Sequence, residues 1–416
     1  MNKDPIMKQF KIALLHYSCP PIVGGVEEII RQHASFFIRY HHRVKIFAGD
    51  GGLFTDKYDI EINSLLSSHN PRILQIHKNL TERSHELQAC SEEIFNYFVR
   101  VLEPYDVLIA HNVLTMPYNL PLTLSLHRLA NNGNIKVVSW NHDSPYFYTP
   151  SPIDLKREQW NILKKYNPNI YYITISEERG EQFQNLYGIK GIDVIPDGID
   201  PIPFFNLDPN TIKMIREKHL LEADLLMLQP CRLHPRKNIE LSIRVIKALQ
   251  DKGLYARLLL TGAHDPHEKN SIEYYYELKK LSEQLHVERD ILILAEYFSE
   301  GSKDLKGGSI IVRDFYLIAD LLFIPSLHEG FGIPLLEAGM LKVPIICSDI
   351  PSFKEIGKEN VQYFSLTDSP DEIADKILAF ISKLNSYRMF HHIIQNYMWD
   401  NIYHKMLLPL LEKVSE

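Results

Sequence analysis

The chain has 416 residues, which is too many for one typical domain and enough to bury two substantial cores. Apolar residues make up 45% and charged residues 23%, an ordinary globular composition that argues against a disordered or low-complexity chain. The net charge of −7 gives no general attraction to nucleic acid, and no apolar stretch is long enough for a membrane span or a signal peptide, so we expect a cytoplasmic protein.

The first elements predict a βαβ unit of a doubly wound α/β fold. A buried-strand pattern over residues 10–17 runs into a turn containing Gly24 and Gly25, followed by a helix over 26–40 and a strand over 44–48. These glycines do not fit the G-x-G-x-x-G pattern of dinucleotide-binding proteins, which argues against an NAD-dependent enzyme. Taken alone, Gly24 and Gly25 are most simply a tight turn.

Two later strands each deliver a histidine to one edge of the predicted sheet. Residues 51–104 predict a loop-rich stretch and then a helix over 84–102, to which we assign no chemistry. Strands over 106–110 and 136–140 then end at His111 and at His142, next to Asp143. Ligands of open α/β sheets bind at this carboxyl edge. A structural role is as good an interpretation for His111, whereas His142 is the stronger candidate for substrate contact.

The second half of the chain repeats the strand-turn-helix pattern with a basic turn. A strand over 225–229 leads to Arg232 and Lys237, which precede a helix over 239–252 and a strand over 256–260. A helix over 274–285 and a strand over 290–294 follow. Arginine offers a hydrogen-bonding fork and lysine a mobile point charge, so the pair indicates an anion site rather than a solvated basic loop.

A nonapeptide, Glu329 to Glu337, forms the most informative turn of the chain. It follows a short apolar run at 319–326, typical of a buried parallel strand, and leads into a predicted helix over 335–341. Its glycines allow close backbone approach, and Pro334 suits a first helical turn, where N–H groups bind anions. The alternative is a solvated loop whose glutamates are ordinary residues of a helix N-terminus. A strand over 343–347, a helix over 371–384 and an aromatic-rich helical region over 388–414 complete the chain.

The nonapeptide, together with the basic pair and the earlier glycines and histidine in the same order, resembles the retaining nucleotide-sugar glycosyltransferases of family four. The resemblance implies the α/β GT-B fold, in which two Rossmann-like, doubly wound parallel-sheet domains face each other across a cleft. It also implies the roles of individual residues. His142 and Glu329 would act at the transferred sugar, and the donor would be bound by Gly24, Gly25, Arg232, Lys237, Phe331, Gly332, Ile333 and Glu337.

Weaker assignments follow from the same resemblance. His111 and Asp143 are candidate neighbours of the acceptor, and Tyr297 is a candidate neighbour of the nucleotide base. Asp197 stands where the family usually has Asn in a Pro-Asn-Gly segment, a change that keeps the turn preference but puts an amide contact in doubt.

The resemblance also divides the chain into two domains. Residues 1–198 would form the acceptor domain, completed by the terminal helical region at about 387–416, and residues 199–386 the donor domain. The connector at 198–208 includes the proline-rich residues 201–205, which suit a linker rather than an element. In the terminal region we expect Tyr397, Trp399 and Tyr403 to pack as core on the first domain.

The implied reaction moves a hexosyl group, glucose or mannose, from a UDP-, GDP- or ADP-sugar to a hydroxyl acceptor with retained anomeric configuration. The sequence has no Asp-x-Asp triplet to hold a metal on the diphosphate, so we expect no metal and no cofactor. A small soluble sugar or sugar acid is the favoured acceptor, and a lipid or cell-envelope polysaccharide is the alternative. Membrane contact is therefore open but not indicated, and no nucleic-acid partner is expected. A non-catalytic sugar-nucleotide-binding protein, a nucleotide-sugar epimerase and a phosphorylase are the rival interpretations.

Overall fold

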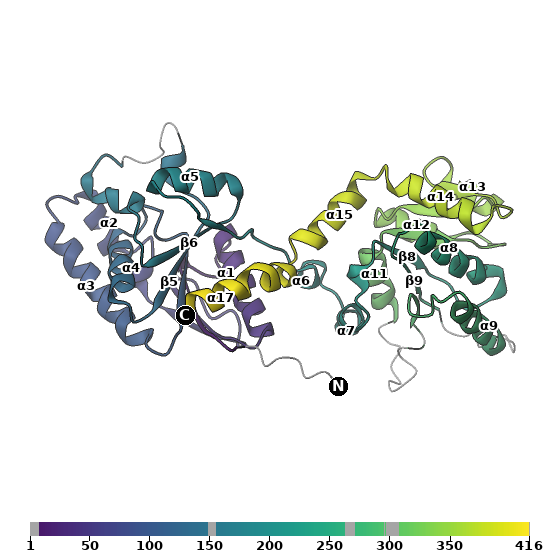
Figure 1. Cartoon of the computed structure of the whole chain (residues 1–416), viewed down its shortest axis with the longest axis horizontal. Helices are drawn as coiled ribbons and strands as arrows, with labels where there is room; N and C mark the ends of the chain where they lie inside the picture. Colours follow the sequence, from purple (N-terminus) through teal and green to yellow (C-terminus); the bar gives the residue numbers. More distant parts are fainter. Residues whose placement is uncertain (1–7, 149–154, 263–270, 295, 297–307, 416) are drawn as a thin grey trace. The chain divides into compact units, whose positions relative to one another are not determined.

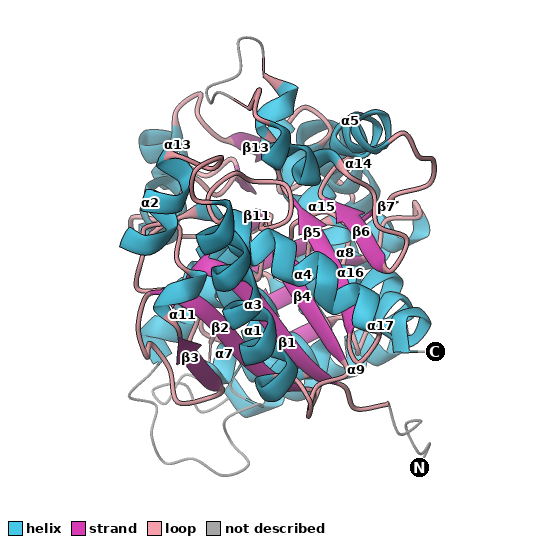
Figure 2. Ribbon diagram, turned by 90° about the vertical axis from the view of Figure 1, so that its left-hand side faces the viewer, coloured by secondary structure: helices cyan, strands magenta, loops and turns pink. Residues whose placement is uncertain are grey.

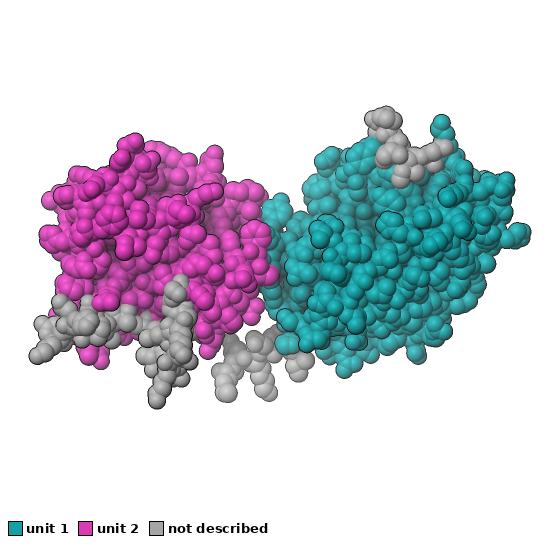
Figure 3. Space-filling view, turned by 180° about the vertical axis from the view of Figure 1, so that it is seen from behind, with its two compact units in different colours: residues 1–200, 396–416 teal, residues 201–395 magenta. Residues whose placement is uncertain are grey.

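The computed structural model describes residues 8–148, 155–262, 271–294, 296 and 308–415. The chain forms two compact units, coloured separately in Figure 3. The first unit comprises residues 1–200 and 396–416, and the second comprises residues 201–395. Each unit carries its own parallel β-sheet (Figure 1). No described helix is both long enough and apolar enough to cross a membrane.

The sheet of the first unit has the strand order β3-β2-β1-β4-β5-β6-β7, and its ladders are parallel. Figure 2 shows β1, β2, β4 and β5 running side by side. The strands are β1 (Lys11–Ser18), β2 (Arg43–Asp50), β3 (Asp59–Ile62), β4 (Val107–His111), β5 (Lys136–Asn141), β6 (Ile170–Thr174) and β7 (Asp193–Val194). The strand order reverses between β1 and β4, and in open α/β sheets a crevice for ligands forms at such a switch point.

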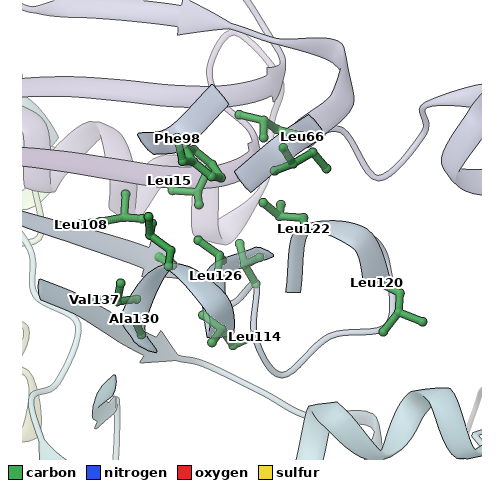
Figure 4. Packing of buried hydrophobic residues seen from close by; sticks show 14 of the residues in the cluster. Leu15, Leu66, Phe98, Leu108, Leu114, Leu120, Leu122, Leu126, Ala130 and Val137 are labelled. Carbon is green, nitrogen blue, oxygen red and sulfur yellow. The ribbon is translucent and has the colours of Figure 1, made fainter. Parts of the chain in front are cut away.

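Alternating side chains of β1 build two hydrophobic cores, one on each face of this sheet. Leu15 packs with the cluster under α2 (Pro71–Lys78), α3 (Ser84–Val101) and α4 (Leu120–Asn132). Figure 4 shows Leu15 and Leu108 of the strands near Phe98 and Leu126 of these helices. Leu14 points to the other face, against α1 (Gly25–Arg39) and the C-terminal segment. The helix after β6 is α5 (Glu177–Tyr187).

The C-terminal segment returns to the first unit and completes its second core. It contains α16 (Trp399–Ile402), a π-helical turn (Tyr403–Leu407) and α17 (Leu408–Ser415). Trp399 and Tyr403 are buried in the cluster under α1, as expected, and Tyr403 packs edge-on against Phe36. The expectation for Tyr397 was wrong, because 38% of it remains exposed.

Charged groups at the boundary of the first unit meet on one arginine. Arg39, the last residue of α1, pairs with Asp200, the last residue of the unit's first segment. The same guanidinium lies 3.1 Å from Asp400 in the C-terminal segment. The preceding helix α15 (Asn385–Asn396) belongs to the second unit except for its last residue, and Nε2 of His391 on this helix lies 2.9 Å from Oδ1 of Asp320.

The second unit repeats the same winding, with the strand order β10-β9-β8-β11-β12-β13 and parallel ladders. Its switch point lies between β8 and β11. The strands are β8 (Leu225–Gln229), β9 (Ala256–Leu260), β10 (Ile291–Ile293), β11 (Leu321–Ile324), β12 (Ile345–Ser348) and β13 (Gln362–Phe364). The other helices are α6 (Pro201–Phe205), α7 (Pro209–Lys218), α8 (Ile239–Asp251), α9 (Ser271–Gln284), α11 (Gly308–Ile318), α12 (Ile333–Met340), α13 (Pro351–Gly357) and α14 (Pro370–Ile381).

Three elements depart from the sequence-based expectation. The stretch 51–104 contains β3 and α2 in addition to the expected helix. α2 begins where the Asn70 side chain accepts hydrogen bonds from the N–H groups of Arg72 and Ile73, with Pro71 at the first position. Residues 201–205, expected to be a linker without regular structure, form the short helix α6, because proline fits the first turn of a helix as well as it fits a linker.

Candidate functional site

The switch point of the first unit brings the predicted histidines to the ends of neighbouring strands. Asn112 follows β4 with a positive φ of 52°, and its backbone N–H donates to the carbonyl of Trp140 at 2.8 Å. Its side-chain Oδ1 accepts from the N–H groups of His142 at 3.1 Å and Asp143 at 3.0 Å. One amide side chain therefore fixes the backbone of the loop that carries His142.

The two neighbours predicted for an acceptor have different environments. His111 is fully buried, and its ring packs edge-on against His33 with the centroids 4.9 Å apart. Burial holds the pKa of His111 well below its usual range. Asp143 lies 3.2 Å from Arg179 and accepts a hydrogen bond from the Tyr148 hydroxyl at 2.7 Å. The carboxylate beside the His142 ring is that of Asp197, with Oδ2 3.4 Å from Nδ1.

The backbone conformation at Gly24 and Gly25 does not require glycine. Gly24 has extended backbone angles that any residue adopts, and the atoms nearest to a Cβ there would be those of the Glu27 carboxylate, the closest 2.0 Å away, at the end of a side chain that accepts a hydrogen bond from Ser18. A Cβ on Gly25 would meet nothing within 4 Å. The room above this turn, at the start of α1, suits close approach of a ligand to the backbone.

The switch point of the second unit joins the basic turn to the nonapeptide. Lys237 forms an ion pair with Glu329, which also accepts a hydrogen bond from Ser326 at 2.8 Å. Arg236 lies 2.9 Å from the second carboxylate oxygen of Glu329. Burial disfavours the charge on Glu329, but the hydrogen bonds from Lys237 and Ser326 outweigh it and hold the pKa of the carboxyl below its usual range.

The two turns are also held together through their backbones. The N–H of Leu327 donates to the carbonyl of Arg236 at 2.8 Å. The Gln229 side chain donates to the carbonyl of Lys237 at 2.9 Å and accepts from the Ser242 hydroxyl at 2.6 Å.

Sequence reasoning had missed Arg236, although its position next to Lys237 was a signal. Arg232 lies exposed in the same turn.

Glu337 lies on α12 beside a pocket of about 380 Å³ formed with α11. The Tyr316 hydroxyl on α11 donates a 2.7 Å hydrogen bond to Oε2 of Glu337. Burial, followed by this hydrogen bond to a carboxylate, raises the pKa of Tyr316 well above its usual value. Tyr316 therefore orients a carboxylate that borders a pocket, a contact that no sequence pattern indicated.

The middle of the nonapeptide presents backbone and apolar side chains to solvent. Phe331 and Ile333 are 55% and 60% exposed. Gly332, which precedes α12, has a φ of 119°, a conformation that favours glycine. Tyr297, the predicted base neighbour, lies outside the described residues. Within the described part of the chain, no group of three or more histidine, cysteine or acidic side chains is placed to hold a metal ion.

Comparisons with known proteins match both halves of the chain. A model described as "Glycosyltransferase Family 4" matches residues 23–202, and one described as "Glycosyl transferases group 1" matches residues 211–396. The mannosylglucosylglycerate synthase of Petrotoga mobilis is 26% identical over 378 residues, covering 83% of this chain and 84% of that protein. The synthase of the same name from Thermotoga maritima is 24% identical over 381 residues, covering 86% and 85%. Among solved structures, sucrose-phosphate synthase from Thermosynechococcus elongatus is 15% identical, with 98% and 99% coverage and a TM-score of 0.41.

Proposed function

Because the chain belongs to the family-four glycosyltransferases of GT-B architecture, we propose that it moves a hexosyl group from a nucleotide sugar to a hydroxyl of a small sugar-acid acceptor. It is an enzyme, a hexosyltransferase. The proposal for the acceptor draws on the two relatives named as mannosylglucosylglycerate synthases, whose product carries a glycerate carboxylate. Glucose or mannose is the proposed sugar, and the nucleotide is UDP, GDP or ADP.

The ion pair between Lys237 and Glu329 is the observation that carries this proposal. Their side chains are only 13% and 12% exposed, and Arg236 adds a second cation to the same carboxylate. Taking charges out of water is costly, so partly buried pairs at a sheet's switch point are strong candidates for functional groups. The cations suit a diphosphate leaving group, and the carboxylate suits the positive charge that develops on a sugar during transfer.

The proposed reaction keeps the anomeric configuration of the sugar. The bond between the anomeric carbon and the donor phosphate breaks, and a bond from the acceptor oxygen forms on the same face. The acceptor's proton passes to the departing phosphate. Glu329 stabilises the oxocarbenium-like sugar, while Arg232, Arg236 and Lys237 neutralise the phosphate without a metal ion. His142 contacts the transferred sugar, and Glu337, oriented by Tyr316, binds the ribose hydroxyls.

A thermal-shift and product screen tests the proposal. Purified protein in EDTA is mixed with UDP-glucose, GDP-mannose, ADP-glucose or UDP-GlcNAc, alone and with sugar acids or their uncharged methyl esters. We expect one donor to raise the melting temperature, and nucleotide release to require both that donor and the free acid. Glu337→Gln should remove the shift, whereas Glu355→Gln, an exposed glutamate on α13, should retain it.

Each other result has a definite meaning. Donor binding without turnover, across all acceptors including lipid-linked ones, would favour a non-catalytic sugar-nucleotide-binding protein. Equal rates with the acid and its methyl ester would overturn the sugar-acid assignment. Activity that is lost in EDTA and restored by a divalent cation would overturn metal independence. A shift that survives Glu337→Gln would remove the proposed ribose contact.

A further inference from the structure

A carboxylate lies beside the His142 imidazole on a segment outside the predicted site. Asp197 follows β7, and its Oδ2 lies 3.4 Å from Nδ1 of His142. The two side chains are 27% and 11% exposed, so little water reaches the contact. The separation is long for a hydrogen bond, as it often is for catalytic groups before a substrate binds.

The backbone that carries Asp197 is fixed on both sides. Before it, the N–H of Ile195 donates to the carbonyl of Thr174 at 2.9 Å. After it, a Cβ on Gly198 would lie 2.7 Å from the Trp399 ring, so the chain passes directly against the C-terminal segment. The N–H of Ile199 then donates to the carbonyl of Tyr397 at 2.8 Å. Since Asn112 fixes the His142 loop, both partners of the contact are held in place.

Three histidines near His142 remain uncharged and so do not form an ion pair with Asp197 in its place. Burial lowers the pKa of His33 to about 3 and that of His16 to about 4, and it holds the pKa of His111 well below its usual range. The negative charges of Asp197 and Glu27 favour protonation of His33 and His16 respectively, but less than burial opposes it. The three rings from β1, α1 and β4 therefore stay neutral near pH 7.

An ionised carboxylate can only accept hydrogen bonds, so its neighbour fixes one tautomer of the imidazole. A hydrogen bond from the neutral His142 ring to Asp197 therefore requires the proton on Nδ1. Nε2 of His142 is buried and has no hydrogen-bond partner among the described residues. In that tautomer Nε2 is an acceptor, to which the O–H of a sugar hydroxyl can donate. The asparagine usual at this position in the family can both donate and accept, so it is compatible with either tautomer of the imidazole. An ionised aspartate only accepts, so it is compatible with a proton on Nδ1 alone.

We propose that Asp197 is a positioning residue of the transfer reaction: it accepts Nδ1–H of His142 and so presents Nε2 as the hydrogen-bond acceptor for a hydroxyl of the transferred sugar. The role of that hydroxyl rests on the proposed function, whereas the tautomer does not. The consequence is a specificity for donors that keep the hydroxyl. A donor with hydrogen or fluorine at that carbon has no proton to give to Nε2.

The tautomer is measured first, in the whole protein without substrate. Long-range ¹H–¹⁵N spectra of protein labelled with ¹⁵N-histidine distinguish a protonated ring nitrogen from a bare one, and His142→Gln assigns the signals. In the wild type we expect His142 with protonated Nδ1 and bare Nε2. In Asp197→Asn we expect a mixture of tautomers. Asp193→Asn is the matched control, because Asp193 lies nearby on β7 and pairs with exposed Lys413 at 3.4 Å.

Kinetics with the donor identified by the screen then separates positioning from stability. Asp197→Asn should lower kcat about tenfold to a hundredfold and change the KM of the acceptor little, because the lost interaction is strongest in the transition state. Asp197→Glu, which keeps the carboxylate, should restore part of the rate. Asp193→Asn should keep the wild-type kcat. A donor with hydrogen in place of the hydroxyl that Nε2 binds should have the same low kcat with the wild type and with Asp197→Asn.

Two results would overturn the proposal. The first is a wild-type spectrum in which His142 carries its proton on Nε2, and this needs no variant to fold. The second is an Asp197→Asn protein with the wild-type tautomer and the wild-type kcat. If the wild type turns over no donor, the proposed function fails, and the spectrum still decides whether Asp197 fixes the ring.

Discussion

At the scale of single residues, Lys237 is the side chain of the second unit whose loss should lower kcat/KM for the donor most. Its ammonium pairs with Glu329, while Arg236 contacts the same carboxylate from a side chain that is 46% exposed. We expect Lys237→Met to lower kcat/KM for the donor about a hundredfold and to raise the pKa of Glu329. Arg236→Gln should cost less, about tenfold, because solvent screens its charge more strongly. Steady-state kinetics checks both, and equal losses would contradict this ranking.

The buried histidines of the first unit should make its stability depend on pH. Their pKa values in the folded protein, about 3 for His33 and about 4 for His16, lie below the usual value near 6.5, so the unfolded chain binds protons first as the pH falls. Stability is then complete above about pH 6.5 and is lost below it, by about 2 kcal/mol per histidine at pH 5.

Urea unfolding at pH 7.5 and 5.0 measures this loss. The fluorescence of Trp140 and Trp399 reports it directly, because both rings lie 4.7 Å from His33 between centroids. His33→Phe should reduce the pH dependence, whereas His219→Gln, which changes an exposed histidine of the second unit, should leave it unaltered. A first unit equally stable at both pH values would show that His33 and His16 bind protons in the folded protein as readily as in the unfolded chain.

At the scale of elements, the short helix α16 matters more than its length suggests. Trp399 is 1% exposed, its indole donates to Gln32 of α1, and its ring lies against Gly198. Trp399→Ala should lower the free energy of unfolding of the first unit by about 3 to 5 kcal/mol. Tyr397→Ala, two residues earlier and 38% exposed, should cost less than about 1 kcal/mol. Similar losses for both would mean that the segment is held by its backbone rather than by the indole.

Buried strands were the elements that the sequence predicted best. β8 and β9 have the predicted bounds, because each contains a short run of buried apolar residues, Leu225–Leu228 in β8 and Leu258–Leu260 in β9. The edge strand β3 was missed, since its four residues are half-buried or exposed and carry two acids. The turns after β8 and β11 were predicted from their motifs. The contacts of Asp197 with His142 and of Tyr316 with Glu337 join residues 55 and 21 positions apart, and no local pattern encodes them.

At the scale of the whole molecule, the two units differ in how they are assembled from the chain. The second unit is one continuous segment with two cores of its own, whereas the first needs residues from both ends of the chain. A fragment spanning 201–395 should therefore unfold cooperatively on heating, as followed by circular dichroism. A fragment spanning 1–200 should not, until a peptide spanning 396–416 is added. Cooperative melting of 1–200 alone would contradict this asymmetry.

The return of the C-terminal segment to the first unit also sets the order of events during synthesis. About 195 residues separate the two segments of this unit, which at roughly 5 to 20 residues per second means a delay of roughly 10 to 40 seconds. Throughout that delay the surface that later covers Trp399 is uncovered on the ribosome, while the second unit, made later, is able to finish first. The first unit, whose synthesis starts before that of the second unit, is thus the last to complete its fold, and its uncovered apolar surface is available to chaperones for the longest time.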